Sequence, residues 1–185
     1  MTDTSQEISP PAVACGPIPT IETQRLTLRA HTLDDFAACA ALWGDPRVTR
    51  HIGGRPLGEE EVWTRFLRSR GHWALFGFGF WLVIERTTGR CVGAVGFADF
   101  KRAIEPPLGD APEQGWVLAA WAHGQGFATE AVRASLDWAA PLGWRRTVCL
   151  IHPENQASRR VATKCGYREL VRTTYKGDPV IVFER

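Results

Sequence analysis

The chain has 185 residues, of which 44% are hydrophobic and 23% are charged, and its formal net charge is +2. This length and balance predict one globular domain with a substantial core and exclude global disorder. The small net charge and the scattered arginines argue against nucleic acid as a partner. No apolar run is long enough to predict a membrane span.

Cysteine usage bears on metal binding and on the cellular compartment. The chain has an odd number of cysteines, with neither a Cys-x-x-Cys pair nor Cys/His spacing typical of zinc, so we expect free thiols and no metal site. Reduced thiols favour a cytoplasmic protein, and the N-terminus lacks the apolar core of a signal peptide. The cysteines are Cys15, Cys39, Cys91, Cys149 and Cys165.

Residues 1–18 contain Ser, Thr and Pro with almost no apolar periodicity. Such a segment has little apolar surface to bury, so it is predicted to be a flexible N-terminal tail. Residues 19–185 contain no internal repeat and no linker. They are therefore expected to form a single domain.

The first half of that domain is expected to hold one strand, two helices and a hairpin. Residues 23–29 alternate apolar and polar side chains, which is typical of a half-buried strand. A helix is predicted from Thr32 to Gly44 and a second one from Leu57. Other expected features are an irregular segment at 47–56, an aromatic and Gly-rich stretch at 73–80, and hairpin strands at 81–85 and 91–97.

A Pro/Gly-rich loop at 101–112 precedes the second half. The elements expected there are a strand at 113–120, an amphipathic helix at 128–142, a strand at 146–151, a helix at 155–164, and strands at 167–172 and 180–184. The resulting order, β-α-α-β-β-β-α-β-α-β-β, predicts a mixed α/β domain.

The segment 121–131 is the most informative stretch, because it joins an apolar strand to a helix through two glycines. A turn containing Gly124 and Gly126 can aim several free backbone N–H groups at one point. The next helix adds its own unpaired N–H groups and the positive end of its dipole. We therefore expect a phosphate or pyrophosphate site. It is not a P-loop, since no Gly-Lys-Ser/Thr follows the loop, and it is not a dinucleotide fingerprint, since Thr129 replaces the third glycine.

A second motif follows about one strand later, and two shorter segments accompany the pair. In their order, the four segments resemble the GNAT superfamily of acetyl-CoA-dependent N-acetyltransferases, and within it the branch that contains ribosomal-protein N-terminal acetyltransferases. The likeness covers roughly residues 20–185. Besides the glycine loop, the segments are Thr23-x-Arg25-Leu26-x-Leu28-Arg29, Glu113-x-Gly115-Trp116 and Asn155-x-x-Ser158-x-x-Val161-x-x-Lys164-x-Gly166-Tyr167.

This resemblance implies a GNAT-like mixed α/β fold, with a mostly antiparallel sheet of about six to seven strands, about four helices, and strands that splay apart at the cofactor site. It also implies acetyl-CoA as the acetyl donor, with the pyrophosphate on the loop amides and the pantetheine arm along the splayed strand. The residues implied to bind this cofactor are Leu118, Ala119, Ala120, His123, Gly124, Gln125, Gly126, Phe127, Ala128, Thr129, Asn155 and Ser158.

Two of these positions carry a second interpretation. His123 stands where the family usually has Gln or Arg, so it is either a phosphate contact or an exposed loop histidine. Asn155 stands at a helix start, where Asn is a frequent N-cap, and it can serve as a cap and a cofactor contact together.

The reaction implied by the resemblance is direct attack of an amine on the thioester, which needs no enzyme nucleophile. Glu113 is the first candidate for the base, either directly or through water, although it is as readily a surface carboxylate. Ser158 is the candidate donor to the departing thiolate. Many family members place a Tyr four positions further on, where this chain has Ala162. Tyr175 or water are the alternative acids, unless no strong acid is needed.

The acceptor is expected to be a primary amine, either a small molecule or a protein N-terminus, on a protein that is a monomer or a homodimer. The acceptor half is predicted to contain an aromatic-rich wall, which suits an apolar or cationic group if it is not simply core. Glu105 and Asp110 are candidates to attract an amine. The wall residues are Trp43, His51, Ile52, Gly53, Gly54, Arg55, Trp73, Phe76, Phe78 and Phe80.

Two other functions fit the same motifs. The missing Tyr at Ala162 is consistent with a protein that binds CoA but has lost most catalysis, such as a sensor. The strand–loop–helix alone is also consistent with a protein for another phosphorylated ligand.

Overall fold

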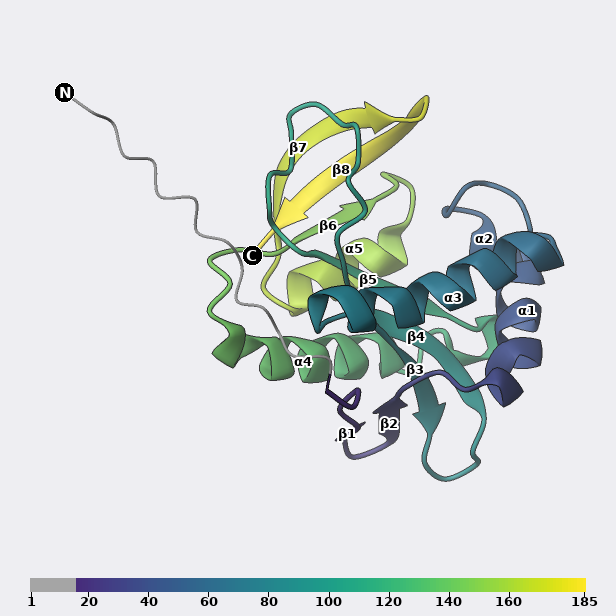
Figure 1. The fold of residues 1–185 in the computed structure, drawn as a ribbon. Coiled ribbons are helices and arrows are strands. Elements are labelled where there is room, and N and C mark those ends of the chain that lie inside the picture. Colours follow the sequence, from purple (N-terminus) through teal and green to yellow (C-terminus); the bar gives the residue numbers. More distant parts are fainter. Residues whose placement is uncertain (1–15) are drawn as a thin grey trace.

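The structure, a computed structural model, describes residues 16–185, so most of the predicted tail, and Cys15, lie outside the described residues. These residues form one eight-stranded sheet in the order β1-β2-β3-β4-β5-β6-β8-β7 (Figure 1). Every neighbouring pair is antiparallel except β5 and β6, which are parallel. The mixed α/β class and the mostly antiparallel sheet are confirmed. The described chain has eight strands and five α-helices, slightly more than expected.

The first half departs from the prediction at three places, of which the first is the short strand β1 (Ile21–Glu22), which was not predicted. A short helix forms inside the segment predicted to be irregular, because Pro46 begins it and the Asp45 side chain accepts a hydrogen bond from the Arg47 amide. The long helix also continues into the aromatic stretch and ends only at Gly77, whose φ is 68°. The elements are β1 Ile21–Glu22, β2 Leu26–Arg29, α1 Phe36–Gly44, α2 Pro46–Thr49 and α3 Glu59–Phe76.

From the hairpin onward the chain follows the predicted order, with bounds that differ by a few residues. Its elements are β3 Phe80–Glu85, β4 Cys91–Ala98, β5 Glu113–Leu118, α4 Phe127–Ala139, β6 Val148–Ile151, α5 Gln156–Lys164, β7 Arg168–Tyr175 and β8 Asp178–Glu184. Short 3₁₀ turns precede α1 and α4 and follow α4. No helix among residues 16–185 is long and apolar enough to cross a membrane.

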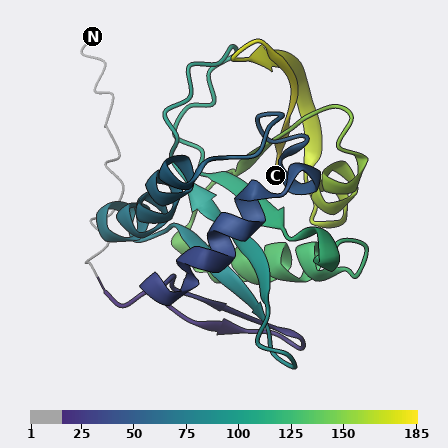
Figure 2. The ribbon, with the colours of Figure 1, turned by 90° about the vertical axis from the view of Figure 1, so that its right-hand side faces the viewer.

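Strand β3 shows how the two faces of the sheet are covered. Leu82 packs with Cys39 of α1 and Phe66 of α3, whereas Val83 belongs to the larger cluster that includes Val132 of α4. This alternation is what a strand buried on both faces requires. Helices α1 and α3 therefore cover one face and α4 the other, with α5 beside α4 (Figure 2).

The two central strands separate almost as soon as they pair. Strand β4 pairs with β5 over six residue pairs, but the parallel register between β5 and β6 contains only Glu113 and Val148. Beyond that point the two strands no longer form a ladder. The splay expected at the cofactor site is therefore present, and it opens on the side where β5 leads into the glycine loop.

Candidate active site

The glycine loop presents a continuous row of backbone amides. Gly124 and Gly126 both adopt left-handed conformations, with φ of 76° and 82°, which glycine adopts without steric cost. Within the described chain, the N–H groups of Gly124 to Thr129 have no hydrogen-bond acceptor, and the first paired amide is that of Glu130, bonded to the Gly126 carbonyl at 3.1 Å. Six consecutive unpaired donors at the start of α4 are the arrangement that the predicted anion site requires.

The N-terminal motif holds this loop in place. The Arg25 guanidinium donates to the Gln125 carbonyl at 2.9 Å and lies 4.5 Å from the centre of the Phe127 ring. It also pairs with the Glu130 carboxylate of α4, to which the Thr23 hydroxyl donates at 2.6 Å. Although partial burial opposes it, these donors hold the pKa of Glu130 below its ordinary value.

A cleft of about 650 Å³ extends from the loop to the start of α5. Most of the residues expected to bind the cofactor line it, namely Leu118, His123, Gly124, Gly126, Phe127, Ala128, Thr129, Asn155 and Ser158. Ala119, Ala120 and Gln125 are not among its lining residues. Lys164 of the second motif also lines the cleft, together with three cations that the motifs did not identify: Arg47, Arg50 and Arg160. They could only have been found by knowing that α2 and α5 meet there.

Strand register decides which backbone groups face the gap beside β5. The Ala119 N–H donates to Val92 at 2.8 Å, so this amide is already used, contrary to the expectation that it is free for the cofactor. Because antiparallel pairing alternates, the backbone groups of Trp116 and Leu118 point the other way, toward the gap. The His123 ring Nε2 donates to the Leu118 carbonyl at 3.0 Å, since a carbonyl can only accept.

The start of α5 places a free hydroxyl in the cleft. Asn155 caps the helix, and its Oδ1 accepts the Ser158 amide at 3.0 Å, which confirms the N-cap interpretation. The Ser158 hydroxyl has no partner within residues 16–185 and lines the cleft. Ala162 is fully buried against the core, so this helix position faces away from the cleft.

A second cavity, of about 210 Å³, lies beside the first, between β5, β6 and α3. Six residues line both cavities and so form their junction: His51, Ile52, Trp116, Val117, Asn155 and Ser158. A thioester held in the first cavity and an amine held in the second would meet there. The two cavities thus have the arrangement that a two-substrate transfer requires.

The predicted base lies in the second cavity but is already paired. Glu113 is only 7% exposed, and both of its carboxylate oxygens accept hydrogen bonds from Arg102, at 2.5 and 2.7 Å. Tyr175, the alternative acid, lines neither cavity, and its ring centre lies 4.7 Å from the Arg102 guanidinium. The structure therefore brings Glu113 and Ser158 to adjoining cavities and leaves Tyr175 outside.

Two histidines meet at the junction. The rings of His51 and His152 are stacked, with centres 5.4 Å apart. Partial burial, with Arg50 and His152 nearby, holds the pKa of His51 below its usual value, so its imidazole is neutral at pH 7. Sequence reasoning placed His51 in the acceptor half but missed His152, whose position directly after β6 was the available signal.

These histidines bear on the expectation of no metal site. Together with Glu154 they form the one group in the described chain whose three ligand atoms lie within 4.8 Å of one another. The His152 Nδ1, however, already accepts the Glu154 amide at 3.2 Å. We therefore assign no metal to this group.

The aromatic wall divides into two parts. Trp43, His51, Ile52 and Phe80 line the second cavity, whereas Trp73 and Phe78 pack in the aromatic core around Trp81, Trp138 and Trp144. Gly53, Gly54, Arg55 and Phe76 do not line it, and neither do Glu105 and Asp110. The predicted carboxylates are thus not positioned to attract an amine into this cavity.

Comparison with known proteins gives the same picture. A family model described as an acetyltransferase (GNAT) domain matches residues 25–168. An uncharacterised N-acetyltransferase, p20, from Bacillus licheniformis is 28% identical over 152 residues, which cover 81% of this chain and 83% of the relative. The crystal structure of an acetyltransferase from Agrobacterium tumefaciens has 30% identity and a TM-score of 0.78, and the match covers 92% of this chain and 95% of that one.

Other solved structures share the fold at lower identity. The ribosomal L7/L12 alpha-N-protein acetyltransferase RimL, in complex with CoA, has 21% identity and a TM-score of 0.72, over 90% of this chain and 97% of that one. Spermidine N-acetyltransferase from Vibrio cholerae, in complex with CoA and spermine, has 17% identity and a TM-score of 0.68, over 88% and 96%. With the family match, the amide loop and the two adjoining cavities, the chain belongs to the GNAT family of acetyl-CoA-dependent N-acetyltransferases.

Proposed function

We propose that this protein transfers the acetyl group of acetyl-CoA to a primary amine by direct attack, with both substrates bound together. The observation that carries the proposal is the junction of the two cavities, where a cofactor cleft ending at Ser158 meets a separate pocket. The acceptor is a small molecule or a protein N-terminus. Two structural neighbours are named as acetyltransferases of a ribosomal protein and of spermidine, which supports both kinds of amine.

The residues of the cleft fit acetyl-CoA. The unpaired amides from Gly124 to Thr129 suit its pyrophosphate, and the gap-facing backbone groups of Trp116 and the N–H of Leu118 suit the amides of its pantetheine arm. Arg50, Arg160 and Lys164 line the cleft and make no ion pair within the described residues, so they are available to its remaining phosphate. When bound, acetyl-CoA supplies the activated acetyl group.

The transfer itself is a single exchange of bonds. The amine nitrogen forms a bond to the acetyl carbon, the carbon–sulfur bond breaks, and the sulfur leaves as a thiolate. We assign to Ser158, whose hydroxyl has no partner in residues 16–185, the hydrogen bond to that sulfur. A thiol of ordinary acidity is a tolerable leaving group, so a single weak donor is sufficient.

For the proton of the amine we propose His51 as the acceptor. Its ring is neutral at pH 7, so one ring nitrogen has a lone pair that can accept a proton. The ring also lies at the junction of the two cavities. Glu113 is less suited to this task, because both of its carboxylate oxygens already accept hydrogen bonds from Arg102. We assign Glu113 the task of holding Arg102 in the wall of the second cavity.

The test is a thiol-release assay with purified protein, acetyl-CoA and a broad panel of primary amines. We expect amine-dependent release of free CoA and a higher melting temperature with acetyl-CoA present. Stabilisation without release for any amine would contradict the transfer reaction and support a CoA-binding sensor. Equal stabilisation by unrelated nucleotides would instead support a protein for another phosphorylated ligand.

A further inference from the structure

The second cavity contains two arginines without a carboxylate partner. Arg65 and Arg68 lie one helical turn apart on α3 and both line the cavity. Among residues 16–185, neither guanidinium forms an ion pair or donates a hydrogen bond. Each rests on an aromatic ring instead: Arg65 lies 4.4 Å from the centre of the Trp43 ring, and Arg68 lies 5.0 Å from that of Phe100. Their N–H donors are therefore held in place but unused.

The cavity has more positive than negative charge. Arg102 adds a third guanidinium, and the carboxylate in the lining, Glu113, is already paired with it. Burial holds the pKa of Arg65 and Arg68 below the ordinary arginine value, and repulsion among the three guanidiniums lowers it further. The carboxylates of Glu61 and Glu113 attract Arg65 and Arg68 respectively, and this attraction offsets part of the lowering of the two pKa values.

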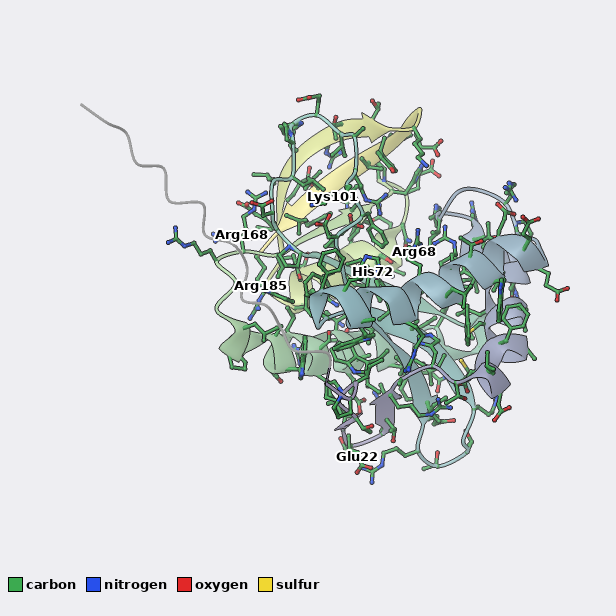
Figure 3. The ribbon with its side chains drawn as sticks, viewed as in Figure 1. Glu22, Arg68, His72, Lys101, Arg168 and Arg185 are labelled. Atoms are coloured by element: carbon green, nitrogen blue, oxygen red, sulfur yellow. The ribbon has the colours of Figure 1, made fainter. Side chains whose placement is uncertain are left out.

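The same geometry disfavours a second cation. The faces of Trp43 and Phe100 that would bind an ammonium group are already covered by guanidiniums. The remaining polar side chains in the wall are histidines and neutral Ser, Asn and Gln side chains, which add no negative charge. Figure 3 places Arg68 and His72 on the side of α3 that faces the loop before β5 and the β7–β8 hairpin. A bound polyamine would thus meet positive charge without compensation.

We propose that the acceptor is a small amine that also carries a carboxylate, an amino acid in the broad sense, and that Arg65 and Arg68 bind this carboxylate. Guanidinium groups match carboxylate geometry and bind it through paired N–H donors. The volume of about 210 Å³ suits an acceptor of amino-acid size, since drug-sized ligands occupy roughly 300–1,000 Å³. This inference rests on the proposed acetyl transfer, because it names the substrate class of that site.

The experiment compares amino acids with the amines that their decarboxylation gives: tyrosine with tyramine, leucine with isoamylamine and β-alanine with ethylamine, with spermidine as the polycation. Thiol release gives kcat/KM for each. Equilibrium binding to the protein–CoA complex is measured in parallel, so the comparison does not depend on turnover. We expect at least one amino acid to exceed its decarboxylated partner about tenfold in both measurements, and spermidine to be the poorest acceptor.

The variants are Arg65→Met and Arg68→Met, which keep much of the apolar stem and remove the charge. Each should reduce the preference for the carboxylate about tenfold and leave acetyl-CoA affinity unchanged. Arg70→Met is the matched control, because Arg70 lies on the same helix but does not line the cavity. If Arg70→Met reduced the preference for the carboxylate as much as the other two variants do, the role assigned to Arg65 and Arg68 would be excluded.

Failure of this inference is distinguishable from failure of the proposed function. Equal binding and turnover of each pair, or preference for spermidine, would overturn the carboxylate site while leaving acetyl transfer intact. Preferential binding of an amino acid without any thiol release would support the carboxylate site and contradict the transfer reaction.

Discussion

Arg25 pairs with Glu130 across more than a hundred residues of chain, with Nε and Nη2 at 2.7 and 2.6 Å from the same carboxylate oxygen. Arg25 precedes β2, whereas Glu130 lies in the first turn of α4. The same guanidinium donates to the Gln125 carbonyl. The conformation of the amide loop is therefore set in part by a residue that lines neither cavity.

Replacing Arg25 should weaken acetyl-CoA binding without removing any direct contact. In Arg25→Met the loop loses the hydrogen bond to Gln125 and the pairing with Glu130, so its amides become less ordered. We expect the affinity for acetyl-CoA to fall about tenfold. Titration calorimetry with acetyl-CoA measures this. Arg86→Met is the control, since Arg86 donates to Thr23 but does not touch the loop. An unchanged Kd in Arg25→Met would refute this positioning role.

His51→Asn should change the pH dependence of kcat as well as its size. Because the pKa of His51 is below its usual value of 6.5, the wild-type ring is neutral above that pH and becomes protonated below it. Wild-type kcat should therefore hold down to about pH 6.5 and fall only at lower pH. The variant should lose about a hundredfold in kcat at pH 7 and lack this acidic limb.

Glu113→Gln separates the two candidate bases. It leaves Arg102 without its carboxylate, so we expect a loss of stability of about 3 kcal/mol, with the acidic limb of kcat retained. Chemical denaturation and a pH–rate profile give both quantities. If the limb disappears in Glu113→Gln and persists in His51→Asn, the base is Glu113.

Ser158→Ala should lower kcat about tenfold and leave the KM for acetyl-CoA nearly unchanged. Its hydroxyl is assigned to the sulfur that leaves, where charge develops only in the transition state. The Asn155 cap uses the Ser158 backbone amide, which alanine retains, so the helix start stays intact. A rise in KM at constant kcat would show that the hydroxyl contributes to binding rather than to catalysis.

Stability should fall between about pH 6.5 and pH 4 because of His31. This residue is 6% exposed, and burial lowers its pKa from 6.5 to about 4. The folded state favours the neutral ring, so the contribution is complete above pH 6.5 and is lost as the pH falls toward the folded pKa. The contribution of His31 to the free energy of unfolding that is lost over this window amounts to about 3 kcal/mol. Urea denaturation of wild type and His31→Gln should show a smaller loss over this window in the variant.

The sequence predicted the parts of the site that depend on local backbone chemistry. Gly124 and Gly126 could be identified because a left-handed turn requires glycine, and Asn155 because its cap needs only neighbouring residues. The alternation in 23–29 and the hairpin were predictable for the same reason. The Arg25 motif was noticed only through family resemblance, since its partner Glu130 is distant in sequence.

The rest depends on tertiary structure. The Ala119 amide donates to Val92 because of the strand register, which no local sequence pattern shows. The pairing of Glu113 with Arg102 depends on how a Pro/Gly-rich loop folds back over β5. The aromatic wall was predicted to suit an apolar or cationic group, because sequence does not reveal that Arg65 already covers the ring of Trp43.

The most direct test of the account is the acetyl-CoA affinity of Gly126→Asp, measured by calorimetry beside Gly143→Asp. Both glycines have positive φ, so the control reproduces the backbone strain at a site remote from the cleft. A carboxylate among the six unpaired amides should repel the pyrophosphate and lower affinity at least a hundredfold, whereas the control should bind like wild type. Wild-type affinity in a folded Gly126→Asp protein would contradict the claim that these amides hold the cofactor.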